Sequence, residues 1–145
     1  MKIILATFGS RGDVQPMLAL SMALQSAGHD VLLAGPPEKV GWAEHLGCPY
    51  KPFGRDVTSF IDSMKDAHSI KPAIDFIKYV REETVSQFQN LPGIIKGADL
   101  VIGASLMFGL SSVAEHMGIK YRYVAFTPQL LKSGYHPPFV LKHQG

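Results

Sequence analysis

Residues 2–13 have the sequence Lys2-Ile-Ile-Leu-Ala-Thr-Phe-Gly-Ser-Arg-Gly-Asp13, in which a short apolar run meets a glycine-rich turn. An uninterrupted apolar strand is typical of a parallel sheet that is covered on both faces. Apolar residues from Met17 to Leu24 follow at helical spacing, and Gly28 is placed to end that helix. The opening of the chain therefore predicts a strand, a tight turn and a buried helix.

The same alternation continues along the chain. We expect further strands at 30–34, 48–52, 99–102 and 120–126, and further helices at 38–46, 57–64 and 108–117. Prolines at one side and at the end of the 48–52 strand place it at an edge of the sheet. Strands that alternate with helices form right-handed crossovers. The fold class is therefore α/β, a doubly wound parallel sheet, and we expect the strand order 3-2-1-4-5.

The longest predicted helix begins at Ile70 and ends or kinks at Pro92-Gly93. Its apolar residues at helical spacing are Ile70, Ile74, Ile77, Val85 and Phe88. The opposite side carries Asp75, Lys78, Glu82, Glu83 and Gln89. This pattern predicts an amphipathic helix with one face on the core.

Composition restricts the class of protein. The 145 residues suit one domain, and 46% hydrophobic with 18% charged residues suits a globular core. A net charge of +2 gives no basic patch of the size that nucleic acid requires. The single Cys48 allows no internal disulfide and fits a cytoplasmic protein, and the six histidines lack the spacing of a metal site. No apolar run is long enough to span a membrane, although peripheral contact with one stays open.

The turn after the first strand is the candidate site, because open α/β sheets bind ligands beyond the carboxyl ends of their strands. Gly9 and Gly12 permit a tight turn and close backbone approach. Asp13 lies at the start of the helix, where it suits two roles: an N-cap, or an acid that faces the cleft. A dinucleotide site is disfavoured because the third glycine of that motif is absent, and no Gly-Lys-Ser/Thr follows for a phosphate-binding P-loop.

Several longer segments resemble one enzyme group. They are Phe8-Gly-Ser-Arg-Gly-Asp-Val-Gln-Pro-Met-Leu-Ala-Leu20, Ala27-Gly-His-Asp-Val-Leu-Leu-Ala34, Asp99-Leu-Val-Ile102, Val113-Ala-Glu-His-Met-Gly-Ile119, Ala125-Phe-Thr-Pro128 and His136-Pro-Pro-Phe139. Together they resemble the N-terminal domain of GT-B glycosyltransferases, in the family 28 N-terminal and UDP-glycosyltransferase superfamily. The resemblance is greatest to sterol glucosyltransferases and antibiotic glycosyltransferases, and it covers essentially the whole chain.

The resemblance implies a Rossmann-like, acceptor-binding domain of an inverting enzyme. Such an enzyme transfers a hexose from a nucleotide sugar, here expected to be a UDP-sugar, to a hydroxyl of a lipophilic acceptor such as a sterol, lipid or polyketide. By position Asp13 matches the general base, and Gly9, Ser10, Arg11 and Gly12 would shape the edge of the cleft. The nucleotide sugar is a co-substrate, so no cofactor or metal is implied.

Plant relatives orient a histidine base with an aspartate after the fourth strand, whereas this chain has Gly103-Ala-Ser105 there. A carboxylate base needs no partner to select a tautomer, so the departure is compatible with Asp13 as base.

Acceptor recognition is expected from the middle of the chain and from the loops after the fourth and fifth strands. An apolar, aromatic lining suits a lipophilic acceptor, although about half of such residues are expected to be ordinary core. The candidates are Phe53, Phe60, Met64, Phe76, Tyr79, Met107, Phe108, Phe126, Tyr135 and His136.

The resemblance also implies a second domain that grips the nucleotide diphosphate, and its His-x-Gly-x-Gly-Thr signature is not found in residues 1–145. We therefore expect residues 1–145 to form only the acceptor-binding domain and to be inactive without that partner. Two alternatives remain. One is a non-catalytic subunit of a split glycosyltransferase that binds an acceptor or a membrane. The other is an unrelated nucleotide-binding module, which Ala34-Gly35 disfavours because an acid is expected there to hold a ribose.

Overall fold

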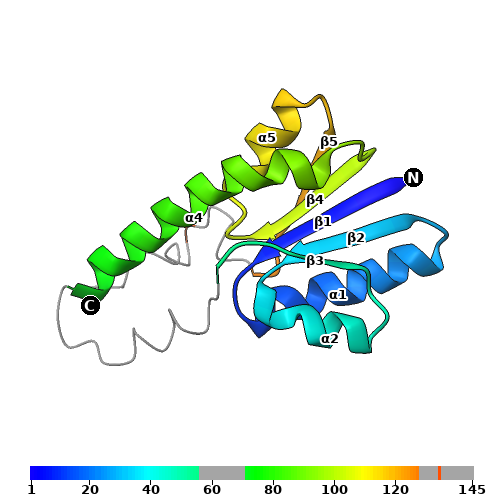
Figure 1. Cartoon of the computed structure of the whole chain (residues 1–145), viewed down its shortest axis with the longest axis horizontal. Helices are drawn as coiled ribbons and strands as arrows, with labels where there is room; N and C mark the ends of the chain where they lie inside the picture. The colour runs from blue at the N-terminus through cyan, green and yellow to red at the C-terminus, as the bar shows by residue number, and fades with distance from the viewer. Residues whose placement is uncertain (56–70, 128–133, 135–145) are drawn as a thin grey trace.

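The computed structural model describes residues 1–55, 71–127 and 134, and gives only the backbone of residues 71–74 and 76. The described residues form a layered α/β fold in which helices cover both faces of one sheet (Figure 1). The predicted helix at 57–64 lies outside these residues, as do the side chains of Ile70 and Ile74 in the predicted apolar pattern.

Five parallel strands make up the sheet of the described residues, and their order is β3-β2-β1-β4-β5. The order 3-2-1-4-5 and the α/β class are thus confirmed, and β3 is the expected edge strand. The strands are β1 (Lys2–Phe8), β2 (Asp30–Gly35), β3 (Tyr50–Pro52), β4 (Leu100–Ser105) and β5 (Lys120–Val124).

Helices are distributed over both faces. They are α1 (Arg11–Ser26), a short 3₁₀ turn (Pro37–Lys39), α2 (Val40–His45), α4 (Lys71–Ile95) and α5 (Leu110–His116). Side chains of β1 alternate between the two faces, as the pleat of a strand requires. Ile3 and Leu5 pack with α1 and α2, whereas Ile4 and Phe8 pack with α4 and α5. Both faces of β1 are buried, which explains its uninterrupted apolar sequence.

Several boundaries differ from the sequence prediction. Helix α1 begins at Arg11, well before the apolar stretch, so Pro16 lies inside the helix. Strand β3 begins at Tyr50 rather than at residue 48, and β4 extends to Ser105. Helix α4 continues past Pro92 to Ile95. Leu91 and Ile95 are fully buried against the sheet, and this packing retains the last turn despite the hydrogen bond that a proline removes.

The face that α4 turns to the core also differs from the prediction. Ile77, Val85 and Phe88 are exposed. The buried positions recur every four residues instead, at Tyr79, Glu83, Gln87, Leu91 and Ile95. A polar pair therefore sits on the inner face of the helix, at the level of the carboxyl ends of β1 and β4.

Candidate functional site

The turn between β1 and α1 is built around Gly9. Its φ of +146° lies in a region that L side chains rarely adopt. A Cβ at this position would also stand 2.2 Å from Oδ2 of Asp13. Glycine is therefore required at this position of the turn. Gly12 shows no such need, because a Cβ there would meet only Ser10 Oγ at 3.7 Å.

Asp13 is the third residue of α1, and Ser10 occupies the N-cap position. Of the two roles open to Asp13, that of the N-cap is therefore excluded, because the helix begins at Arg11 and its N-cap lies three residues before Asp13. The backbone N–H of Ser10 donates to Oδ2 of Asp13 at 2.7 Å, and the Ser10 hydroxyl lies 3.0 Å from the same oxygen. The carboxylate thus accepts the backbone N–H of the N-cap residue, as the acid at the third position of a capping box does.

The second carboxylate oxygen of Asp13, Oδ1, is held by a residue at the end of β4. The Ser105 hydroxyl donates to Oδ1 at 2.6 Å across 92 residues of sequence. Ser105 ends β4 and pairs with Phe8, the last residue of β1, so strand register brings the two residues together. The φ of Ser105 is +56°, and it is the one non-glycine residue with positive φ in the described part of the chain. Backbone strain of this kind persists where the surrounding structure imposes it and is frequent at functional sites.

Tyr123 on β5 extends this network. Its hydroxyl donates to the backbone oxygen of Ser105 at 3.1 Å. Burial, and then the negative charge of Asp13, raise the pKa of the Tyr123 hydroxyl. The three residues come from α1, β4 and β5, and they meet at the carboxyl ends of the strands, where this fold class binds ligands.

Gln87 fixes the loop that follows Ser105. Its side-chain amide donates to the backbone oxygen of Leu106 at 2.9 Å, and its oxygen accepts from the backbone N–H of Gly109 at 3.0 Å. Gln87 is fully buried, so water does not compete for these bonds. The inner face of α4 therefore positions the β4–α5 loop next to Asp13.

The predicted site residues separate into groups. Gly9, Ser10 and Asp13 lie together at the turn, while the guanidinium of Arg11 lies 5.3 Å from the ring centroid of Trp42 on α2. Phe53, Tyr79 and Met107 are buried in the core between the sheet and α4, and Phe108 is 53% exposed beside them. Phe126 packs on the opposite face of the sheet, apart from the others. Outside the described residues or side chains lie Phe60, Met64, Phe76, Tyr135 and His136.

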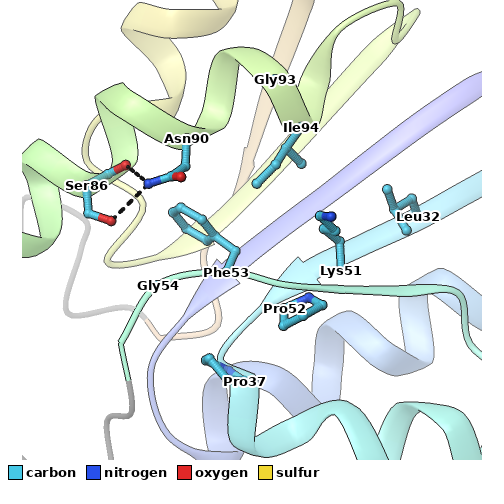
Figure 2. A pocket seen from close by; sticks show the side chains of 10 residues that line it. All are labelled: Leu32, Pro37, Lys51, Pro52, Phe53, Gly54, Ser86, Asn90, Gly93 and Ile94. Carbon is cyan, nitrogen blue, oxygen red and sulfur yellow. Dashed lines mark hydrogen bonds between the residues drawn. The ribbon is translucent and has the colours of Figure 1, made fainter.

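A cavity of about 680 Å³ lies between α4 and the β2–β3 side of the sheet (Figure 2). Phe53 is the predicted acceptor residue that lines it, together with Lys51 and Ile94. Asn90 also lines it and donates to the backbone oxygen and the hydroxyl of Ser86, at 2.8 and 3.2 Å. The volume of this cavity is in the range of small-molecule sites. Asp13 does not line this cavity, so the cavity and the Asp13 network are separate features.

Glu83 is a buried carboxyl that the sequence pattern places on the solvent side. It is 3% exposed, and neither of its oxygens has a hydrogen-bond partner of normal geometry in the described part of the structure. Burial raises the pKa of this carboxyl above its ordinary value. Gln87 and Arg55 lie close enough to lower that pKa in part, but burial dominates.

The stability of the protein is therefore expected to depend on pH through Glu83. With a raised pKa the native state holds a proton that the unfolded state releases, so stability falls as pH rises from the ordinary value of 4.5 through the native pKa. Denaturation midpoints of the wild type and Glu83→Gln, measured from about pH 4.5 to about pH 8, should diverge in favour of the variant. A constant difference across that range contradicts the assignment. Glu82→Gln, which changes the exposed neighbour, serves as the control.

Two residues of this site do not emerge from sequence reasoning. Ser105 is notable in the sequence only as the absence of an acid, although the expected strand order already places the end of β4 beside the end of β1. Glu83 falls on the polar side of the predicted helix, and no local signal indicates the rotation of α4 that buries it together with Gln87. The described helices also include none that is long and apolar enough to cross a membrane.

Comparison with known proteins places this geometry among related chains. Residues 3–136 match the glycosyltransferase family 28 N-terminal domain. The chain is 34% identical over 143 residues to the glycosyltransferase GtfE of Amycolatopsis orientalis, and 33% identical over 141 residues to the vancomycin aglycone glucosyltransferase of the same organism. Each alignment covers 95% of this chain but 34% of the relative, so the chain spans about a third of their length. The crystal structure of the calicheamicin glycosyltransferase CalG4 superposes with a TM-score of 0.73 at 16% identity, covering 92% of this chain and 35% of that one.

Proposed function

Because the chain belongs to the glycosyltransferase family 28 N-terminal domain family, we propose that it is the acceptor-binding domain of an inverting, nucleotide-sugar-dependent glycosyltransferase. The observation that carries the proposal is the Asp13 carboxylate. Three hydrogen-bond donors hold it at the carboxyl end of the central strand, and it is only partly buried. A carboxylate fixed in this way is oriented before any substrate binds.

Asp13 acts as the general base in this proposal. An acceptor hydroxyl gives its proton to the carboxylate while its oxygen attacks the anomeric carbon of the sugar. The bond from that carbon to the nucleoside diphosphate breaks on the opposite side, so the configuration inverts. Gly9, Ser10, Arg11 and Gly12 form the edge of the cleft on which the sugar is placed. Ser105 positions Asp13 and does not itself contact the reacting atoms.

The acceptor is proposed to be a lipophilic molecule with a reactive hydroxyl, such as a polyketide, a sterol or another lipid. The apolar side chains around the loop after β4 support this class, since Met107 and Phe108 adjoin the strand end that carries Ser105. The transferred sugar is a hexose. A relative named as a vancomycin aglycone glucosyltransferase supports a hexose as the transferred sugar and an aglycone as the acceptor.

A second domain is proposed to bind most of the nucleotide sugar. The developing negative charge on a leaving diphosphate needs preorganised donors, and this electrostatic stabilisation is usually the largest catalytic contribution. In the β1–α1 turn the backbone N–H of Ser10 is directed to Asp13, so this donor does not point to a diphosphate. Residues 1–145 alone are therefore expected to have negligible transferase activity.

The test is a transfer assay with and without the C-terminal domain of a family relative. UDP-glucose and dTDP-glucose are supplied as alternative donors, with vancomycin aglycone as the first acceptor and a sterol as the second. Product that forms only when both domains are present supports a two-domain enzyme. Turnover by residues 1–145 alone contradicts the proposed division of labour, and a lack of product from every combination removes the support for a catalytic role.

A second candidate is a non-catalytic subunit that binds a partner or a membrane surface. Three exposed apolar side chains on α4, Ile77, Val85 and Phe88, favour it. Co-sedimentation with anionic lipid vesicles distinguishes the two functions. Binding that Ile77→Ser abolishes, with no transferase activity under the conditions above, is the result expected of such a subunit.

A further inference from the structure

The buried carboxyl of Glu83 is the polar group that the proposed chemistry leaves unexplained. Removing a carboxyl from water without a compensating hydrogen bond is costly, and native structures rarely retain such a group without a reason. The charge of Arg55 acts on Glu83, but this guanidinium pairs with the exposed Glu82 and lies over the ring of Tyr79, 5.9 Å from its centroid. Gln87 and the Arg55 backbone lower the pKa of Glu83 only in part, and neither carboxylate oxygen has a hydrogen bond of normal geometry to a described residue.

A narrow cavity, without room for a water molecule, is lined by this residue. Glu83 lines it together with Phe8 from the end of β1, Leu106 and Phe108 from the loop after β4, and Tyr79 from α4. The other walls are aromatic or aliphatic, so Glu83 is the one charged group among the residues that line it. Gly54 packs closely against the carboxyl, because a Cβ there would stand only 3.1 Å from Oε1 of Glu83.

The cavity adjoins the Asp13 network through the chain itself. Phe8 directly precedes the Gly9 turn, and Leu106 directly follows Ser105, whose hydroxyl holds Asp13. The space is too narrow for a water molecule as it stands, so a ligand enters only when a wall moves. The most exposed wall is Phe108, whose side chain is 53% exposed. The apolar space and its carboxyl therefore lie in the same strand-end region as Asp13. A molecule that presents one hydroxyl to Asp13 is close to both.

We propose that Glu83 is the polar end of an acceptor subsite, where it accepts a hydrogen bond from an O–H or N–H group of the acceptor other than the hydroxyl that reacts. This inference rests on the proposed function and narrows its substrate class. The acceptor is an apolar or aromatic molecule with at least two hydrogen-bond donors, one attacked at the anomeric carbon and one bound at Glu83. Acceptors without the second group leave the buried carboxyl unpaired and bind less tightly.

Three probes of one framework test the subsite: toluene has no donor, benzyl alcohol has an O–H, and benzylamine has charged N–H groups. Their dissociation constants for this chain are measured by NMR titration, following the backbone amides of Leu106 and Phe108. The wild type is expected to bind benzyl alcohol or benzylamine about 10-fold more tightly than toluene, as suits one hydrogen bond to a charged or buried carboxyl. The preferred probe tells whether the acceptor group is a hydroxyl or an amine.

Matched variants separate binding at Glu83 from binding elsewhere on the chain. Glu83→Leu should abolish the preference while raising the denaturation midpoint, because an unpaired buried carboxyl is replaced by a side chain that packs. Glu83→Gln should keep the preference for the alcohol and lose that for the amine, and Glu82→Gln should change neither. The proposal is overturned if the wild type binds all three probes equally or binds none of them. A preference that survives in folded Glu83→Leu also overturns it.

Failure of this inference is distinguishable from failure of the proposed function. Asp13→Asn is expected to leave the probe preference intact, because the probes report the Glu83 cavity and not the base. A preference lost in Asp13→Asn but retained in Glu83→Leu assigns the binding to Asp13 and overturns the subsite. A subsite that behaves as expected, in a chain that supports no transfer with any second domain, contradicts only the enzymatic proposal.

Discussion

The Asp13→Asn variant, joined with the C-terminal domain, is expected to lose kcat by about 10²-fold or more, which is the size of a general-base contribution. Asparagine has the shape of aspartate and still accepts the hydrogen bond from the Ser10 backbone, but it does not take a proton. The KM for the acceptor should change little. Initial rates over a range of acceptor concentrations, at saturating nucleotide sugar, measure both quantities.

Helix capping is the competing role for Asp13, and stability distinguishes it from catalysis. The Asn variant retains a capping oxygen, so its free energy of unfolding should fall by no more than about 1 kcal/mol. Asp99→Asn is a matched control, because Asp99 also accepts a backbone N–H at 2.7 Å, from Lys2, but at the opposite end of β1. Full activity in Asp13→Asn would reduce Asp13 to a structural residue of the α1 turn.

Removal of the Ser105 hydroxyl is expected to have the second largest effect on transfer. A hydrogen bond to a charged group is worth about 1.5–3 kcal/mol, which corresponds to a loss of roughly 10-fold to 100-fold in kcat if the whole effect reaches the base. The expected loss is in kcat rather than in KM, because Ser105 contacts Asp13 and not the substrate. Steady-state kinetics of Ser105→Ala in the two-domain enzyme provide the measurement.

Glycine at the same position separates the hydroxyl from the backbone strain. Ser105→Ala and Ser105→Gly both lack the donor, so both should lose activity to a similar extent. The φ of +56° suits glycine but not alanine. The free energy of unfolding in urea should therefore be about 1 kcal/mol higher for Ser105→Gly than for Ser105→Ala. An Asn at this position tolerates positive φ and has an amide that can donate, and it should recover part of the activity. A Gly variant with wild-type kcat would show that the hydroxyl does not position the base.

The rotation of α4 about its axis could not be predicted from the sequence. The existence and approximate length of the helix are predictable from apolar spacing, because that spacing is a local property. Two interleaved sets of residues satisfy the same helical period, however, and the set ending at Phe88 is the more apolar. The structure buries the other set, since Leu91 and Ile95 anchor the helix to the sheet and fix its rotation. The position of Glu83 follows from that rotation, and composition gives no sign of it.

The turn after β1 shows the opposite case. A continuous apolar strand, Gly9 and an acid four residues later are all adjacent in sequence, and they are sufficient to locate the candidate site. The acceptor residues are harder to assign, because an aromatic residue has the same place in the sequence pattern whether it belongs to a core or to a binding wall. Phe53, Tyr79 and Met107 are buried in the core, and Phe108 is exposed.

The sequence by itself determined the parallel sheet with its strand order, the glycine that the turn requires, and Asp13 as the acid at the strand end. Those features depend on local periodicity and on the conformational freedom of single residues. Only the tertiary structure decided that Ser105, 92 residues away, holds Asp13, and that Glu83 faces an apolar cavity. Such contacts depend on the register between strands and on the rotation of a helix about its axis. The packing of the whole core sets both quantities, and no short stretch of sequence encodes them.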